Sequence, residues 1–460
     1  MVPAHAVRTP GAAAPYHGAV WTPAQRIAAH RAIESALESA TQGAQAVSAI
    51  VLDHDGNRLY SESPQTAVMP ASTLKLVIAN AALAKRGRAY TYRTVFAATH
   101  DIQDGVLHGN LYLAGSGDPS LRSSDLMRGI RALERAGLRR IDGNLIVDGT
   151  AIGGEEINPL WNAEDVNEDF NAATSGISLD EDTVEFHVNG TVPGAAANVS
   201  INPHSSMVRY DGAVTTSSDG DDVVIGGTML PNEFHLSGVI PPNIRETFYL
   251  PVHGIPQYVA GVTLRMLRDA GISVTGAQTG STPLDSHVLW SRQSPPLSVL
   301  VRHMLVHSDN HYAEQLMRTL DESNTTDAGG LAAEMRYLRD SNVPLEGIRL
   351  ADGSGLARAN RISAATLSAI LQRAERAEGG NALYPLLARG GYDGTLRHYE
   401  FGASRGRVRA KSGHLADVAS LAGYLDTAHH GRLVFAFLVD GSRGDPDRAI
   451  VSALDRLAKF

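Results

Sequence analysis

Ser72-Thr73-Leu74-Lys75 places a hydroxyl and an amine three residues apart, next to an apolar run that predicts a helix. Residues at this spacing share one helix face, so the Lys75 amine can reach the Ser72 hydroxyl. A desolvated lysine near another cation can become a neutral amine and accept the serine proton. A helix N-terminus also offers backbone N–H groups to a developing oxyanion. The tetrad predicts an activated serine, but a helix-capping serine followed by a surface lysine has the same pattern.

Ser308-Asp309-Asn310 lies between two helical stretches. A serine and an asparagine two residues apart in a short turn can point the same way. The hydroxyl can then relay a proton while the carboxamide holds a substrate amide. The alternative for this segment is an N-cap of the following helix, a position that Ser, Asp and Asn favour.

Lys411-Ser412-Gly413 precedes a pair of strongly apolar strands. On an edge strand, Lys411 and Ser412 can bind a substrate carboxylate, and Gly413 allows close approach of the backbone. The alternative is a polar turn before a strand.

Lysine is scarce in this chain, which makes the positions of its few lysines informative. The only lysines are Lys75, Lys85, Lys411 and Lys459, and the other 36 of the 40 basic residues are arginine. Codon bias in a GC-rich genome accounts for this composition. Arginine stays protonated in proteins, whereas lysine can be tuned to a neutral base. Because two of the four lysines fall inside the three motifs, we interpret the motifs together as one active site.

In this order, the three motifs resemble those of the penicillin-recognising serine acyl-transferases. The long segment between the first and second motifs narrows the resemblance to the class C low-molecular-mass penicillin-binding proteins, the D-alanyl-D-alanine carboxypeptidase/endopeptidase family. The resemblance extends from about residue 22 to the C-terminus. Further segments that fit the family are Pro70-Ala71-Ser72, 115–121 (GSGDPSL), 141–148 (IDGNLIVD), 352–358 (DGSGLAR) and 393–396 (DGTL).

The resemblance implies a catalytic role for three residues and a binding role for a fourth. Ser72 is expected to be the nucleophile and Lys75 its general base. Ser308 is expected to relay a proton to the leaving D-Ala amine. Asn310 is expected to hold the amide on the acyl side of the substrate.

The third motif is expected to bind the leaving side of the substrate. The resemblance implies that Lys411 and Ser412, beside Gly413, bind the terminal carboxylate. The backbone N–H groups of Ser72 and His414 are expected to form the oxyanion hole. The chain departs from the family pattern at two of these positions. Ser412 stands where threonine is commoner, and His414 stands where the family usually has a small hydroxyl residue, so we expect the imidazole to alter substrate or β-lactam preference.

Two further residues match the family outside the three motifs. Arg358 matches an arginine near the carboxylate-bearing side chain of the substrate. Asp165 is a weaker match to an aspartate of the inserted region that meets the distal amine of the peptide.

We interpret the other candidate sites as structural features without a catalytic role. His303, His307 and His311 have helical spacing that can bind a metal, but the turn at 308–310 interrupts the helix, so we expect no metal. The chain has no G-x-S-x-G elbow, no H-E-x-x-H and no complete dinucleotide-binding loop, so no cofactor is expected. The absence of cysteine excludes thiolate nucleophiles and Fe–S clusters.

The elements that position the motifs come from both ends of the chain. The sequence predicts a helix from Thr22-Pro23 to Ala40, strands at 47–53 and 58–61, and a helix from Ser72 to Leu83. It also predicts strands at 418–425 and 433–439 and a final helix from Pro446. We therefore expect an α+β fold: a serine transpeptidase/β-lactamase-like domain with an antiparallel sheet between helices, plus a large, mostly-β insertion.

The expected domain organisation is discontinuous. Residues 1–20 are interpreted as a disordered arm, and residues 21–96 and 286–460 as the catalytic domain. Residues 97–285 are interpreted as the insertion, with one helix at 258–269 and an inner subdomain at about 185–248.

Composition limits the classes of partner. The 460 residues have a net charge of -9 and are 43% hydrophobic, which argues against disorder and against a nucleic-acid binder. No apolar stretch is long enough for a transmembrane helix, and Met1 to Trp21 shows no apolar core of a signal peptide. The family resemblance nevertheless implies an extracytoplasmic location, in the periplasm or cell-wall space. It does not indicate an oligomeric state.

The resemblance implies a serine D,D-peptidase that acts on peptidoglycan stem peptides and is acylated by β-lactams. The scissile bond is expected to be the terminal D-Ala-D-Ala bond, the D-Ala-diaminopimelate cross-link, or both. Two alternatives remain: a β-lactamase, which needs fast deacylation, and a non-catalytic peptidoglycan-binding protein on the same fold. Long-lived acylation by a penicillin distinguishes the peptidase from both.

Overall fold

The computed structural model describes residues 18–460 except 42, 172, 229, 378–382 and 443. Residues 1–17 of the predicted disordered arm lie outside the described residues. The described chain forms two compact units. The first contains residues 18–85, 301–309 and 332–460, and the second contains residues 86–300 and 310–331.

A six-stranded antiparallel sheet organises the first unit, in the order β2-β1-β23-β22-β21-β20. The two chain ends meet in this sheet, where β1 pairs with β23 along its whole length. Its strands are β1 (Ala46–Leu52), β2 (Arg58–Glu62), β20 (Ala388–Arg389), β21 (Val408–Leu415), β22 (Val418–Asp426) and β23 (Arg432–Asp440).

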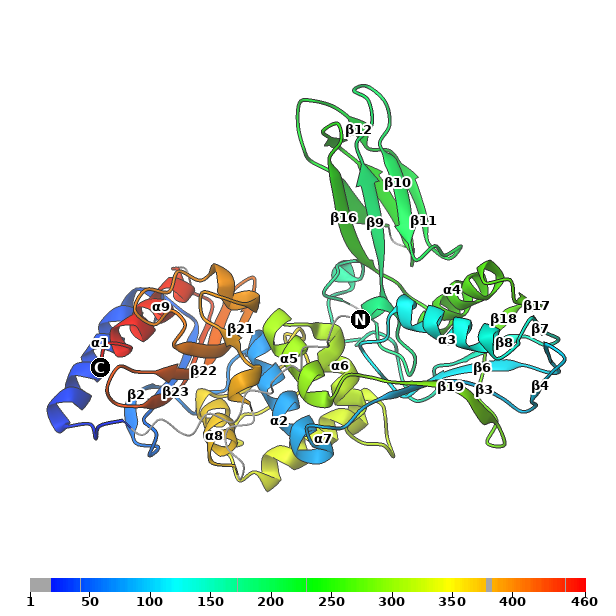
Figure 1. The fold of residues 1–460 in the computed structure, drawn as a ribbon. Helices are drawn as coiled ribbons and strands as arrows, with labels where there is room; N and C mark the ends of the chain where they lie inside the picture. The colour runs from blue at the N-terminus through cyan, green and yellow to red at the C-terminus, as the bar shows by residue number, and fades with distance from the viewer. Residues whose placement is uncertain (1–17, 42, 172, 229, 378–382, 443) are drawn as a thin grey trace, which may run out of the picture. The chain divides into compact units, whose positions relative to one another are not determined.

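Helices cover both faces of this sheet (Figure 1). On one face, Phe435 and Phe437 share an apolar core with α1 (Pro23–Thr41) and α9 (Pro446–Leu457). On the other face, the Tyr424 hydroxyl donates to the carbonyl of Leu371 in α8 (Ala364–Arg376). Because side chains alternate along a strand, the continuous apolar run of β23 reflects burial on both faces. The predicted antiparallel sheet between helices is confirmed.

The remaining elements of the first unit lie around the sheet edge that carries the motifs. They are the 3₁₀ turns η1 (Ala71–Leu74), η4 (Tyr384–Leu386) and η5 (Gly394–His398), and helix α2 (Lys75–Arg86). Two helices, α5 (Leu297–His307) and α7 (Asp327–Asp340), are divided between the units, and the last residue of α2, Arg86, also belongs to the second unit.

The second unit is mostly β-structure, as predicted for the insertion. Its larger sheets have the orders β18-β8-β6-β3-β19 and β17-β7-β5-β4. Their strands are β3 (Arg93–Ala98), β4 (Ile102–Gln103), β5 (Val106–Leu107), β6 (Leu111–Gly115), β7 (Arg140–Ile141), β8 (Leu145–Asp148), β17 (Ser273–Val274), β18 (Ala277–Thr279) and β19 (His287–Gln293).

Three smaller sheets complete the β-structure of the second unit, in the orders β10-β9-β16, β11-β14-β13 and β12-β15. Their strands are β9 (Thr183–Asn189), β10 (Asn198–Asn202), β11 (Arg209–Gly212), β12 (Thr215–Thr216), β13 (Val224–Gly227), β14 (Glu233–Ser237), β15 (Val239–Ile240) and β16 (Arg245–Pro251). Helix α6 (Asn310–Arg318) and the turns η2 (Ala163–Asp165) and η3 (Asp180–Asp182) also belong to this unit.

The expectation of a single helix within 97–285 is wrong, because α3 (Ser123–Arg135) precedes α4 (Ile255–Asp269). The buried residues Leu126, Ile130 and Leu133 of α3 recur at helical spacing, but its arginines dilute the apolar pattern. The unit boundaries also differ from the predicted domain boundaries, because β3 pairs with β6 and β19 pairs with β3 inside the second unit. The division into a catalytic domain and an insertion stays a prediction.

Candidate functional site

Ser72 lies in the turn η1, directly before α2. The Lys75 amine donates a 2.9 Å hydrogen bond to the Ser72 hydroxyl and a 2.7 Å hydrogen bond to the carbonyl of Ser354. Lys75 is fully buried, whereas Ser72 keeps part of its surface exposed. Ala71 has a φ of 47°, a left-handed conformation that costs a residue with a Cβ some energy. A partly exposed hydroxyl therefore contacts a buried amine at the turn that starts the helix.

The segment 352–358 places the Ser354 carbonyl within hydrogen-bond distance of the Lys75 amine. The buried Asp352 carboxylate accepts hydrogen bonds from the backbone N–H groups of Gly355 (2.7 Å) and Ala357 (2.6 Å). Gly355 has a φ of 88°, and a Cβ there would lie 2.0 Å from the carbonyl oxygen of Ala71. Only glycine therefore fits at this contact, which explains why the DGSG sequence occurs beside the nucleophile turn.

Ser308 meets the third motif in the same unit. The Lys411 amine donates to the Ser308 hydroxyl at 2.8 Å and to the carbonyl of Ser412 at 2.5 Å. Ser308 has a φ of 62° in the turn after α5, so the predicted interruption of the helix is confirmed. Lys411 is fully buried, and burial lowers its pKa well below 10.5, with the nearby charge of Lys75 as a further cause.

The edge of β21 runs past the nucleophile turn. β20 pairs with β21 only at Ala410 and Arg409, so no strand of the described chain pairs with the outer edge of residues 411–415. A Cβ at Gly413 would lie 2.7 Å from the Ser72 backbone nitrogen and 2.9 Å from the Pro70 carbonyl oxygen. The edge strand therefore passes close to Ser72, and a peptide can pair with it by adding a strand.

Beyond Gly413, a polar cluster holds the side chains of the third motif. The Ser412 hydroxyl lies 2.7 Å from the Thr395 hydroxyl. The His414 Nε2 lies 2.7 Å from an Asp447 oxygen and 3.1 Å from the Tyr399 hydroxyl. Because a carboxylate only accepts hydrogen bonds, His414 carries its proton on Nε2. Burial raises the pKa of Tyr399, and the charge of the neighbouring Asp447 raises that pKa further.

Sequence reasoning missed Tyr399 and Asp447 and did not single out Thr395. Thr395 lies in the DGTL segment, and Asp447 lies in the first turn of α9. No local spacing connects either residue to Ser412 or His414, so the sequence carries no signal for this cluster.

Two residues predicted to bind substrate lie in the second unit. Asn310 is the first residue of α6, and its carboxamide donates a 2.8 Å hydrogen bond to the carbonyl of Phe170. Asp165 ends the turn η2, and its backbone carbonyl accepts a 2.9 Å hydrogen bond from the Asn171 side chain. Both hydrogen bonds join residues of the second unit.

Arg358 lies in the first unit and is half-exposed. Its guanidinium pairs with the Asp417 carboxylate at 3.0 Å. A substrate carboxylate that binds Arg358 therefore competes with Asp417.

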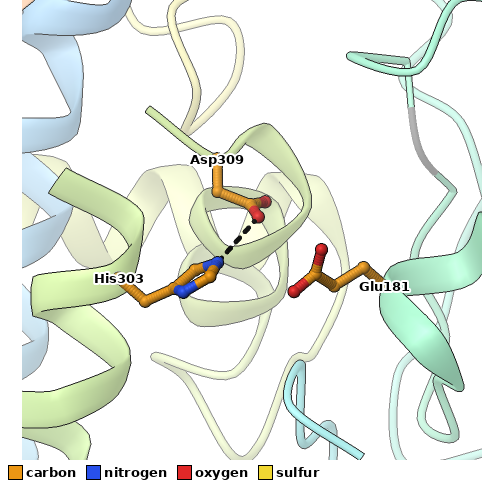
Figure 2. Close-up of side chains that lie close together, drawn as sticks. All are labelled: Glu181, His303 and Asp309. Carbon is orange, nitrogen blue, oxygen red and sulfur yellow. Dashed lines mark hydrogen bonds and ion pairs between the residues drawn. The ribbon is translucent and has the colours of Figure 1, made fainter. Parts of the chain in front are cut away.

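The three histidines at helical spacing do not share one environment. His303 contacts the Asp309 carboxylate at 3.2 Å (Figure 2), and its ring centroid lies 4.7 Å from that of His307. His311 is buried in the second unit, where its Nδ1 lies 2.9 Å from the Ala173 carbonyl oxygen. Glu181, which Figure 2 also labels, belongs to the second unit, where it pairs with Arg122.

The first unit therefore brings together a serine hydroxyl, two buried amines and a second serine hydroxyl from three distant segments. Burial, and then the charge of Lys75, lowers the pKa of Lys411, so the two amines resist carrying two protons at the same time. An amine that is neutral can act as a base, and an amine that is protonated can bind an anionic group. This combination can activate an alcohol nucleophile and bind a carboxylate in one site.

The comparisons with known proteins agree with this chemistry. The sequence profile of the D-Ala-D-Ala carboxypeptidase 3 (S13) family matches residues 29–459. A D-alanyl-D-alanine carboxypeptidase of Actinomadura sp. (strain R39) is 28% identical over 93% of this chain and 84% of its own length.

Solved structures support the fold. Penicillin binding protein 4 from Haemophilus influenzae superimposes with a TM-score of 0.80 at 22% identity, covering 93% of this chain and 99% of the other. The same protein in complex with a β-lactam superimposes with a TM-score of 0.74 at 21% identity, covering 92% and 98% of the two chains. In the described part of this chain, no helix has the length and hydropathy needed to span a bilayer.

Proposed function

Because the chain belongs to the D-Ala-D-Ala carboxypeptidase 3 (S13) family, we propose that it is a serine D,D-peptidase acting on peptidoglycan stem peptides through an acyl-enzyme on Ser72. The observation that carries the proposal is the 2.9 Å hydrogen bond between the buried Lys75 amine and the Ser72 hydroxyl. A second buried amine, Lys411, lies in the same unit, and burial together with the charge of Lys75 lowers its pKa.

In acylation, the Ser72 hydroxyl loses its proton, and the C–N bond of the substrate is replaced by an ester bond to Ser72. Lys75 accepts the Ser72 proton while Ser72 Oγ attacks the D-Ala-D-Ala carbonyl carbon. The backbone N–H groups of Ser72 and His414 stabilise the oxyanion. The C–N bond then breaks, and the proton that Lys75 accepted passes through the Ser308 hydroxyl to the leaving D-Ala amine. Water hydrolyses the resulting ester and restores the Ser72 hydroxyl.

The substrate is held on both sides of the scissile bond. Lys411 and Ser412 bind the terminal carboxylate at the open edge of β21, beside Gly413. Asn310 holds the amide on the acyl side. Arg358, after exchange with Asp417, and Asp165 recognise the charged groups of the stem peptide side chain.

The same acyl-transfer chemistry accounts for further proposed properties. A β-lactam presents a strained amide and a carboxylate, so it acylates Ser72 covalently, in keeping with the β-lactam bound to the Haemophilus influenzae relative. The enzyme also hydrolyses D-alanyl-diaminopimelate cross-links, because the leaving D-centre again carries a carboxylate. Its substrate places it outside the cytoplasm, in the periplasm or cell-wall space.

Incubation with a labelled penicillin, followed by intact mass over hours, tests the proposal. We expect a long-lived adduct that is absent in Ser72→Ala, together with release of D-Ala from a pentapeptide. An adduct that turns over rapidly indicates a β-lactamase instead. No adduct and no D-Ala release would leave only the non-catalytic, peptidoglycan-binding alternative.

A further inference from the structure

The segment 393–395 (DGT) is anchored to α5 at its first residue, within the first unit. The Arg302 guanidinium donates a 3.0 Å hydrogen bond to the Asp393 carboxylate and a 3.1 Å hydrogen bond to the carbonyl of Pro385. The Asp393 carboxylate also accepts a hydrogen bond from the backbone N–H of Arg389. An ion pair and a backbone hydrogen bond therefore fix where the segment begins.

The second residue of the segment, Gly394, touches the last turn of α5. Its φ is 55°, and a Cβ there would lie 2.1 Å from the Val306 carbonyl oxygen. Only glycine tolerates both this φ and this contact. Val306 lies two residues before Ser308, whose hydroxyl accepts the hydrogen bond from Lys411. Leu396, on the other side of the segment, is buried in the apolar core of the first unit. The segment is thus held at both ends beside the Ser308 turn.

Thr395, between these two anchors, reaches the third motif. Its hydroxyl oxygen lies 2.7 Å from the Ser412 hydroxyl oxygen. The neighbouring donors are directed elsewhere. The Lys411 amine donates to the backbone carbonyl of Ser412, and the Tyr399 hydroxyl donates to the Asp447 carboxylate at 3.2 Å. The Thr395 hydroxyl is therefore placed to donate its proton to the Ser412 hydroxyl oxygen.

The direction of this hydrogen bond decides what Ser412 offers to a substrate. A hydroxyl has one proton, and a carboxylate only accepts hydrogen bonds. If Thr395 donates, the Ser412 proton remains for the substrate carboxylate, and the two hydrogen bonds in series strengthen each other. If Ser412 donates to Thr395, it turns a lone pair toward the carboxylate and repels it. An anionic substrate therefore favours the first arrangement.

We propose that Thr395 is a positioning residue for recognition of the substrate carboxylate: its hydroxyl donates to Ser412 and turns the Ser412 proton toward the carboxylate. The inference rests on the proposed function, which assigns Ser412 to the terminal carboxylate. Thr395 acts through Ser412, and the contact at Gly394 keeps it in place relative to the Ser308 turn. Its contribution is specific to substrates and inhibitors with a carboxylate on the leaving side of the scissile bond.

The test compares acylation by a penicillin and by its methyl ester, which lacks the negative charge, in the full chain. Thr395→Val keeps the shape of the side chain without the hydroxyl, and Thr395→Ser keeps the hydroxyl. Thr395→Ala repeats the measurement with a side chain that cannot overpack, in case valine lowers the thermal midpoint. Ser412→Ala and the double variant T395V/S412A complete a double-mutant cycle. Thr66→Val, at an exposed position of the first unit, is the matched control.

We expect Thr395→Val and Thr395→Ala to lower the second-order rate of acylation by the penicillin about tenfold, as for a weakened hydrogen bond to a charged group. Acylation by the methyl ester should stay within about twofold of the wild-type rate, which shows that the nucleophile is intact. Thr395→Ser and Thr66→Val should stay within about twofold for both compounds. In the Ser412→Ala background, Thr395→Val should cause no further loss, because the group through which it acts is gone.

Equal losses for the penicillin and its ester, additive losses in T395V/S412A, or an unchanged penicillin rate in both Thr395→Val and Thr395→Ala would overturn the inference. A wild-type protein that releases D-Ala from a pentapeptide but reacts equally fast with the penicillin and its ester also overturns it, and leaves the proposed function standing. A wild-type protein that is not acylated and releases no D-Ala overturns the proposed function itself.

Discussion

The Lys75 amine lies 2.9 Å from the Ser72 hydroxyl, and the same amine lies 2.7 Å from the Ser354 carbonyl oxygen, 279 residues further along the chain. The first contact follows from helical spacing. The second depends on Asp352 and Gly355, which hold a distant loop against the nucleophile turn. Together they hold the amine of a long, flexible side chain at one position, which a general base requires.

Lys75→Arg should reduce the rate of penicillin acylation by about 10²- to 10⁴-fold, the usual contribution of a general base. The guanidinium keeps the positive charge but cannot become neutral and accept the Ser72 proton. The rate is measured from adduct formation by intact mass. Lys85→Arg is the matched control, since Lys85 lies on the same helix but is exposed. Equal rates in the two variants would show that Lys75 is not the base.

Gly413→Ala should reduce acylation by at least about 10²-fold, because the new Cβ would lie 2.7 Å from the Ser72 backbone nitrogen and must displace an oxyanion donor. Overpacking against the backbone should also cost about 1–3 kcal/mol of stability. Gly226→Ala is the control: Gly226 lies in a strand, and a Cβ added there would point into open space. Acylation rate and thermal midpoint are measured for both, and an active, normally stable Gly413→Ala protein would contradict the close approach.

The stability of the wild type relative to Lys411→Met should rise with pH. Burial lowers the pKa of Lys411 in the folded state, whereas the unfolded chain retains that proton up to about 10.5. Between the lowered pKa and 10.5 the unfolded state therefore binds more protons, so the free energy of unfolding rises with pH. Thermal midpoints of both proteins from about pH 7 to about pH 10 check the sign. The exposed Lys459→Met variant should run parallel to the wild type, and parallel curves for Lys411→Met would contradict the pKa shift.

His414→Thr should change the relative acylation rates of β-lactams that differ in bulk on the carboxylate side, by about tenfold. The imidazole occupies the strand face next to Ser412 and is held there by Asp447 and Tyr399. Tyr399→Phe removes one of these contacts while retaining the ring, so it should have a smaller effect in the same direction. Second-order acylation rates for a bulky and a small β-lactam provide the measurement. Unchanged acylation in His414→Thr would mean that the imidazole does not shape the site.

The local pattern of apolar residues was sufficient to predict much of the fold. Alternating and continuous apolar runs predicted β1, β2, β22 and β23 to within about two residues at each end, because each strand buries at least one face in the core. Helix α3 was missed although its apolar residues recur at helical spacing, because its arginines lower the mean hydropathy of the segment; the periodicity itself was a signal in the sequence.

Sequence alone determined which chemistry this protein can perform. The S-x-x-K spacing is local, and the lysine scarcity separates Lys75 and Lys411, which are buried, from Lys85 and Lys459, which are exposed. The tertiary structure decided which groups surround that chemistry. Lys411 reaches Ser308 across 103 residues, and His414 reaches Asp447 across 33, through contacts that depend on sheet register and helix packing. Such contacts have no short-range signature, because hydrogen bonds between side chains constrain distance in space and leave separation along the chain free.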